Sequence, residues 1–225
     1  MKTTDVAKDL IYLMEVYNLN NVSNQDIENE LGSINNTKLQ KILYIVMGLA
    51  LRVGLTPKES TINNEKNIVL SMFDELPEVW PYGPVFKNIY KNYTQLNQEA
   101  LSANYTPSYE KKDGKNLLQQ RDDEIMKFIL QQIIDSNIAK QNAQDLSEWS
   151  HIDGSPWDST YKTYKRYGVV IDNLKIKNYF INLSKEDLYG LDADSIEKEV
   201  RIIKEKYAKY YSEEKYTTKG HLFDV

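Results

Sequence analysis

A run of apolar residues at helical spacing between residues 38 and 53 constrains this chain more than any other feature. Its members recur every three or four positions, and they are Leu39, Ile42, Leu43, Val46, Leu49, Ala50 and Val53. The spacing predicts a helix with a broad apolar face, with Thr37 as its N-cap and Gly54 as its stop. We expect a helix with so wide an apolar face to lie at the centre of the core.

Patterns elsewhere in the chain also favour helices. They predict helices over residues 4–18, 84–96, 121–136, 144–150, 173–182 and 195–211, and a further helix that begins near Trp157. Residues 18–36 and 56–64 are expected to be connections, the first with one short helical turn at Ile27 and Leu31. Residues 67–73 are ambiguous, and residues 104–116 form a small hairpin or an irregular loop. We therefore expect a mainly α fold, a compact helical domain with at most a small β-hairpin, plus a C-terminal helical extension. The expected division is a domain over residues 1–183 and an extension with a tail over residues 184–225.

Composition excludes several classes of protein. The chain has 225 residues, no cysteine and a net charge of −5, and no apolar run reaches the length of a membrane span. The start MKTTDVAKDL lacks the pattern of an export signal, so we expect a cytoplasmic protein. The acidic balance argues against broad binding to nucleic acid. The local basic sets, Lys38, Lys41 and Arg52 on one helix and Lys87 and Lys91 on another, are interpreted as solvated faces.

The chain shows little sign of catalysis. It has two histidines, no glycine-rich phosphate loop and no GxSxG or HExxH motif. His151 lies near Ser150, Asp153, Ser155 and Asp158, but such close neighbours do not align as a triad, so we expect its ring to satisfy loop backbone groups. The acidic run at residues 122–124 is interpreted as complementing a helix dipole. We expect no enzyme activity, no cofactor and no metal.

Two proline-containing corners stand out. In Trp80-Pro81-Tyr82-Gly83-Pro84 the prolines lack an amide donor and fix their own φ, so the segment must be a rigid turn, with Pro84 expected to start a helix. The second corner is HIDGSPWD at residues 151–158, where Ser155-Pro156 is a natural helix start. We expect Trp80 and Trp157 to fill the core and to meet, and we expect Tyr82 to border the surface.

Three elements resemble the Panacea domain of antitoxins related to SocA, and they occur in the order of that family. They are the KLQKLLY-like TKLQKILY at residues 37–44, WPYGPV at residues 80–85, and an "L…H…GSPW" pattern at Leu146, His151 and residues 154–157. The resemblance covers about residues 5–183 and implies a common scaffold. The scaffold residues are Lys38, Leu39, Gln40, Lys41, Tyr44, Trp80, Pro81, Tyr82, Gly83, Pro84, Val85, His151, Gly154, Ser155, Pro156 and Trp157.

The resemblance implies a non-enzymatic bacterial or phage protein that binds and neutralises a cognate toxin. Two other readings stay open: an adaptor whose tail, residues 212–225, engages a cytoplasmic protease, and a phage protein that binds a host defence or regulatory protein. The expected partner surface lies on the helix over residues 85–96, the loop over residues 97–116 and the C-terminal helix, at Tyr90, Tyr93, Tyr105, Tyr109, Tyr207 and Tyr210. A homodimer through Ile196, Val200, Ile203 and Tyr207 of the last helix is a further hypothesis.

Overall fold

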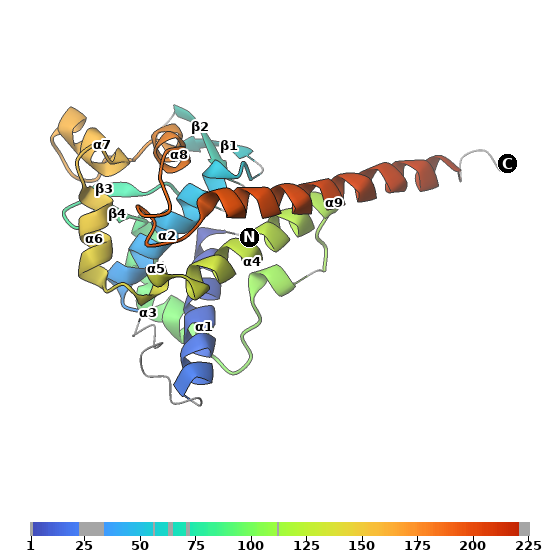
Figure 1. The fold of residues 1–225 in the computed structure, drawn as a ribbon, viewed down its shortest axis with the longest axis horizontal. Coiled ribbons are helices and arrows are strands. Elements are labelled where there is room, and N and C mark those ends of the chain that lie inside the picture. Colours follow the sequence, from blue (N-terminus) through green and yellow to red (C-terminus); the bar gives the residue numbers. More distant parts are fainter. Residues whose placement is uncertain are drawn as a thin grey trace.

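The computed structural model describes residues 2–22, 34–55, 57–62, 65–70, 73–111 and 113–220, which contain nine α-helices and two β-hairpins (Figure 1). The helices are α1 (Thr3–Val22), α2 (Asn36–Arg52), α3 (Lys87–Ala100), α4 (Leu117–Asp135), α5 (Asn137–Lys140), α6 (Ala143–His151), α7 (Pro156–Tyr164), α8 (Asn173–Ile181) and α9 (Ala193–Gly220). The hairpins are antiparallel and pair β1 (Pro57–Ile62) with β2 (Glu65–Leu70), and β3 (Glu78–Trp80) with β4 (Gly83–Val85). The expected mainly α fold is confirmed, with one hairpin more than expected.

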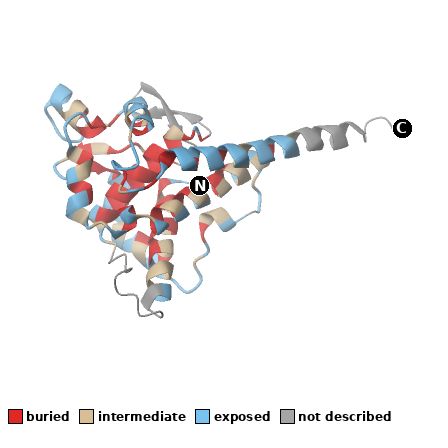
Figure 2. Ribbon diagram, viewed as in Figure 1, coloured by how far each residue is buried: buried red, intermediate tan, exposed pale blue. Residues whose placement is uncertain are grey.

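Helix α2 is the centre of the core, as its apolar pattern predicts. Every residue from Lys38 to Leu51 is buried, and the buried residues of the body gather around this helix (Figure 2). Helices α1, α3, α4, α6 and α8 and strand β4 all pack against it. Gly48 allows the approach of α8, because a Cβ at this position would lie 2.3 Å from the ring of Phe180. Burial on all sides exceeds the single broad face that the sequence predicts.

Several expected helix starts are displaced by side-chain caps. Asn35, not Thr37, caps α2, since its Oδ1 accepts a hydrogen bond from the backbone N–H of Lys38 at 2.9 Å. Helix α4 begins four residues early because Asn116 and Gln119 form a capping box. By contrast, Ser155 caps α7 and Asp172 caps α8 as predicted.

The early start of α4 corrects the role of the acidic run at residues 122–124. These residues lie in the second turn, where the helix dipole stabilises a negative charge only weakly. Asp122 pairs with Arg121 at 2.7 Å and Asp123 pairs with Lys115, and both carboxylates are buried. Glu124 accepts a hydrogen bond from the hydroxyl of Tyr207 on α9 at 2.9 Å. Asp123 thus links α4 to the segment before it, and Glu124 links α4 to α9.

The two regions expected to be loop or ambiguous contain strands. Residues 57–62, expected to be a connection, form β1, and most of the ambiguous stretch at residues 67–73 belongs to β2. The hairpin considered for residues 104–116 is not found in the described part of that segment, which contains a 3-10 turn at Ser108–Glu110. The short helical turn considered near residues 27–31 lies outside the described residues.

Helix α9 lies along α4 and then projects beyond the body (Figure 1). Ile196, Val200 and Tyr207 are buried within the chain, and Ile203 is partly buried. The seam that would form a homodimer is therefore packed inside one chain as far as Tyr207. Among the described residues, no helix combines the length and apolarity needed to cross a membrane.

Candidate functional site

The hairpin β3–β4 holds residues 80–85 as a rigid turn. Trp80 pairs with Gly83 across the loop Pro81-Tyr82, and proline in the second position with glycine in the fourth is typical of a type I turn. Pro84 lies in β4 and does not start a helix as expected, since α3 begins at Lys87. A proline is tolerated here because β4 is an edge strand: among the described residues it pairs only with β3, whose other edge meets Val170.

Gly83 is the point where α2 and α6 approach the turn most closely. Its φ is +99°, in the range that favours glycine. A Cβ here would lie 2.3 Å from Oγ of Ser150 on α6 and 2.7 Å from Nζ of Lys41 on α2. Both backbone conformation and space therefore require glycine at this position.

Helix α2 holds the outgoing strand of the hairpin through two buried side chains. Nζ of Lys41 donates to the carbonyl oxygen of Pro84 at 3.0 Å. The side-chain oxygen of Gln40 accepts from the backbone N–H of Phe86 at 2.7 Å. The first family-like element thus binds the backbone of the second.

Helices α6 and α7 hold the rest of the turn. The indole N–H of Trp157 donates to the carbonyl oxygen of Trp80 at 2.9 Å. The hydroxyl of Ser147 donates to the carbonyl oxygen of Tyr82 at 2.8 Å, and Nε2 of His151 lies 3.1 Å from that of Pro81. Since a carbonyl oxygen can only accept, Nε2 carries the proton in this contact. All three family-like elements therefore meet at one turn.

These contacts bear on three expectations. The ring of His151 satisfies a backbone group, as predicted, and Trp157 meets Trp80 through that residue's carbonyl. Trp80 is only half-buried and is not a core plug. Ser147 was not identified from the sequence. It lies four residues before His151, on the same face of α6, and that spacing is the signal that could have found it.

Burial controls the electrostatics under the turn. It lowers the pKa of Lys41 to about 7 and that of Lys38 to about 8. Burial and the nearby Lys41 lower the pKa of His151, so this ring is neutral near pH 7. The two lysines are therefore not part of a solvated face, contrary to expectation. Lys41 can be buried because its long aliphatic side chain packs among apolar residues while Nζ reaches a carbonyl acceptor.

The exposed side of the turn is aromatic. The Tyr82 side chain is 74% exposed at the tip, and Tyr90 on α3 is 46% exposed. The ring centroids of Trp80 and Tyr90 lie 5.0 Å apart. Trp80, Tyr82 and Tyr90, which we call the aromatic patch, border a cavity of about 320 Å³ whose other walls include Thr37, Gln40 and Val85. This patch is open to a partner, whereas the backbone behind it is fixed.

The other scaffold residues support the core and the second corner. Leu39 and Tyr44 are buried on α2, and burial raises the pKa of Tyr44 well above its usual range. Gly154 has φ +79°, Ser155 caps α7, and Pro156 is the first residue of that helix. Their roles are structural.

The tyrosines expected to form the partner surface divide into two groups. Four are engaged within the chain: Tyr93 with the carbonyl of Ile34, Tyr105 with Asp9 at 2.5 Å, Tyr109 under Lys127, and Tyr207 with Glu124. Tyr90 and Tyr210 are 46% and 44% exposed. Tyr109, Tyr207 and Tyr210 line a second cavity of about 350 Å³ between α4 and α9. Only Tyr90 belongs to the aromatic patch.

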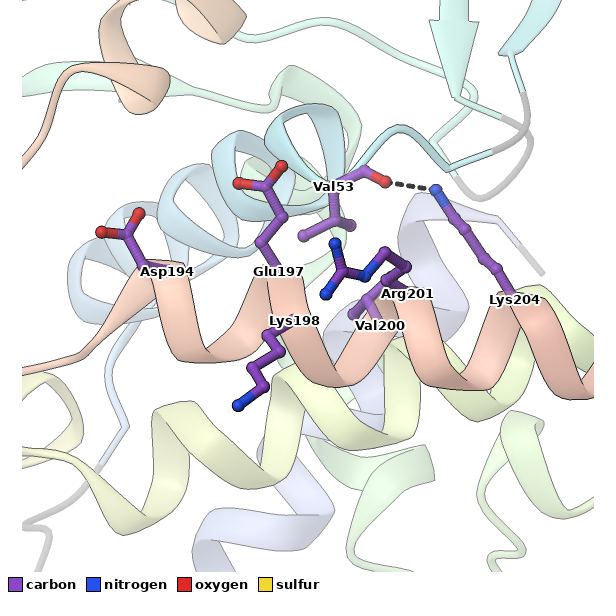
Figure 3. A pocket seen from close by; sticks show the side chains of 7 residues that line it. All are labelled: Val53, Asp194, Glu197, Lys198, Val200, Arg201 and Lys204. Carbon is purple, nitrogen blue, oxygen red and sulfur yellow. Dashed lines mark hydrogen bonds between the residues drawn. The ribbon is translucent and has the colours of Figure 1, made fainter.

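A third and more open cavity, of about 450 Å³, lies where α9 crosses the end of α2 (Figure 3). Lys204 reaches back from α9 to the carbonyls of Val53 and Gly54 and so caps α2. Arg52 donates to the carbonyl of Phe180 at 3.0 Å and pairs with Asp194. These links hold α9 on the body, so we assign this cavity a structural role.

Comparison of the chain with protein-family models, with curated proteins and with solved structures returns no match. Within the described part of the chain, no three His, Asp or Glu side chains gather as a metal site. The candidate site therefore rests on its own geometry. It consists of a turn fixed from three helices, with the aromatic patch on its open side.

Proposed function

We propose that this chain is an antitoxin that neutralises a partner toxin by direct protein–protein binding, and that the aromatic patch is part of the binding surface. One observation carries the proposal: three elements far apart in the sequence, each similar to a Panacea element, converge on a single turn. Trp157, His151, Ser147 and Lys41 bind four carbonyl groups of that turn. Among the described residues, none makes a hydrogen bond or ring contact with the exposed side chain of Tyr82 at the tip of the turn.

The physical chemistry of the patch suits a protein partner. Tyrosine and tryptophan supply large contact areas and have few rotatable bonds, and they are enriched among residues that dominate binding energy. Because hydrogen bonds already fix the turn, little conformational entropy is lost when a partner docks. Tyr82, at 74% exposure, offers the most apolar area to such a partner.

The same proposal assigns the chain a cytoplasmic, non-enzymatic role. The side chains that meet under the turn bond to backbone carbonyls, and the ring of His151 is hydrogen-bonded to the backbone of both Pro81 and Ser147. Burial and Lys41 lower the pKa of His151, which leaves a neutral ring already engaged with Pro81. These contacts support a role in holding the turn.

The test is purification of the tagged chain at native expression, with identification of whatever stays bound through a salt wash. We expect one small protein, encoded beside this chain, that stops growth when it is expressed alone. A bound protein that is harmless alone would contradict the toxin assignment. A protease subunit in the complex would favour the adaptor reading.

Variants locate the surface. Tyr82→Ala combined with Tyr90→Ala should weaken the complex about tenfold or more, as expected for interface hot spots. Leu19→Ala is the matched control, because Leu19 is 62% exposed on α1, outside the patch. Tyr210→Ala tests the alternative surface on α9. Equal affinity for the double variant and the Leu19 control would exclude the aromatic patch as the binding surface.

A further inference from the structure

A second exposed surface lies at the C-terminal end of α7, where the sequence reads YKTYKRYG at residues 161–168. Three tyrosines alternate here with Lys162, Lys165 and Arg166, and the segment contains no acidic residue although the whole chain carries a net charge of −5. Interleaved aromatic and basic residues are typical of surfaces that bind single-stranded nucleic acid. The structure shows whether these side chains are arranged for that purpose.

The rings form a column that runs from the second corner to the surface. Trp157 and Tyr161 are stacked with centroids 5.3 Å apart and an interplanar angle of 17°. Tyr161 and Tyr167 continue the stack at 5.3 Å and 21°. Trp157 is buried, whereas Tyr167 is 51% exposed and ends the column. Another planar ring can extend such a stack.

The backbone that presents Tyr167 is fixed on both sides. Lys165 has φ +52° and ends α7, and its N–H donates to the carbonyl of Tyr161 at 2.7 Å. On the other side, Gly168 and Val169 exchange hydrogen bonds of 2.8 Å with Val79 of β3. The ring is therefore held in place before any ligand binds, which lowers the entropic cost of binding.

The charges beside the column are of two kinds. Lys162 is engaged by Asp153 and by Asp158, the latter at 2.8 Å, and so is not counted. Lys165 and Arg166 are exposed, and no carboxylate of the described residues lies within 4.0 Å of either cationic group. Two exposed cationic residues that directly precede Tyr167 in the chain complement a ligand that combines planar bases with phosphates.

We propose that the column end at Tyr167, together with Lys165 and Arg166, binds single-stranded nucleic acid, with a base stacked on Tyr167 and phosphates at the two cations. This proposal does not rest on the antitoxin assignment. The footprint is small and the rest of the chain is acidic, so the binding is weak and sensitive to salt. Two phosphate contacts predict a slope of about −1.4 for log affinity against log salt, or about a sevenfold loss between about 50 and 200 mM.

The test measures fluorescence anisotropy of labelled oligo(U) and oligo(dT) with the full chain. We expect saturable binding at about 50 mM salt, with the predicted slope. Tyr167→Leu should weaken binding about fivefold or more, whereas Tyr167→Phe keeps the stacking face and should bind nearly as well as the wild type. Lys165→Asn with Arg166→Gln should bring the slope close to zero, and asparagine tolerates the positive φ at residue 165.

The control is Lys198→Gln with Arg201→Gln, which removes two exposed cations from α9 and changes the net charge equally. It should leave the slope unchanged, and thermal melts confirm that each variant is folded. The proposal is wrong if the wild type shows no saturable binding at low salt or if a duplex of the same length binds more tightly. It is also wrong if the control brings the slope as close to zero as the Lys165/Arg166 variant does. It is equally wrong if the Lys165/Arg166 variant loses a protein partner while the wild type binds no oligonucleotide.

Discussion

Replacing Gly83 with alanine should destabilise the protein by about 2–5 kcal/mol. A φ of +99° costs an L-residue about 1–2 kcal/mol in backbone strain. The new Cβ would also lie 2.3 Å from Oγ of Ser150 and 2.7 Å from Nζ of Lys41, so buried side chains must move at a cost of about 1–3 kcal/mol. Movement of Lys41 would lengthen or break its hydrogen bond to Pro84. Urea unfolding followed by far-UV circular dichroism measures the loss by linear extrapolation.

Gly154→Ala separates the two contributions. Gly154 has φ +79°, but a Cβ there would meet no atom within 4 Å. This variant should lose only the backbone term of about 1–2 kcal/mol. The difference between the two variants, about 1–3 kcal/mol, reports the crowding beneath the turn. Equal losses would refute the claim that α2 and α6 converge on Gly83.

Three further perturbations test the buried groups. Relative to Lys41→Met, the wild type should gain stability as pH rises from about 7 to 10.5, by about 1.4 kcal/mol per pH unit. The reason is that the amine is already neutral in the native state while the unfolded chain still binds a proton. Urea midpoints of the two proteins that differ by a constant amount across this range would contradict the prediction. Asp9 is buried with its Oδ2 unpaired, and burial raises its pKa from 3.8 to about 6. Relative to Asp9→Asn, the free energy of unfolding of the wild type should therefore fall by about 3 kcal/mol as pH rises from 3.8 to about 6. Parallel pH profiles of urea unfolding for the two proteins would contradict this prediction. Gly48→Ala should lower the free energy of unfolding by about 1–3 kcal/mol because the new Cβ displaces the ring of Phe180. Adding Phe180→Leu should recover part of this loss. An unchanged melting temperature for Gly48→Ala would contradict the close packing of α2 against α8.

Much of the helical framework could be predicted because its signals are local. The spacing of apolar residues over α2, the serine before α7 and the aspartate before α8 act within a few residues of one another. Where two capping residues compete, local rules fail. Asn35 displaces Thr37 as the cap of α2, and the side chain of Asn36 donates to the carbonyl of Tyr90, which lies 54 residues along the chain.

The site could be predicted only in part, for a similar reason. The motif residues are recognisable in the sequence, which also predicts that Trp157 meets Trp80. The sequence does not predict the burial of Lys38 and Lys41, because lysine is ordinarily an exposed polar residue and the acceptor of Lys41 lies 43 residues away. A nonlocal contact also decides the conformation at Pro84. The local sequence predicts a helix start there, but pairing with Val79 places Pro84 in a strand.

The most direct test of the central claim is growth of cells that express the small protein encoded beside this chain. We expect the small protein alone to arrest growth and the wild-type chain to restore it, whereas Tyr82→Ala with Tyr90→Ala should restore growth poorly although the variant accumulates as a folded protein. Full rescue by that double variant, or a neighbouring protein that leaves growth unchanged, would exclude neutralisation through the aromatic patch.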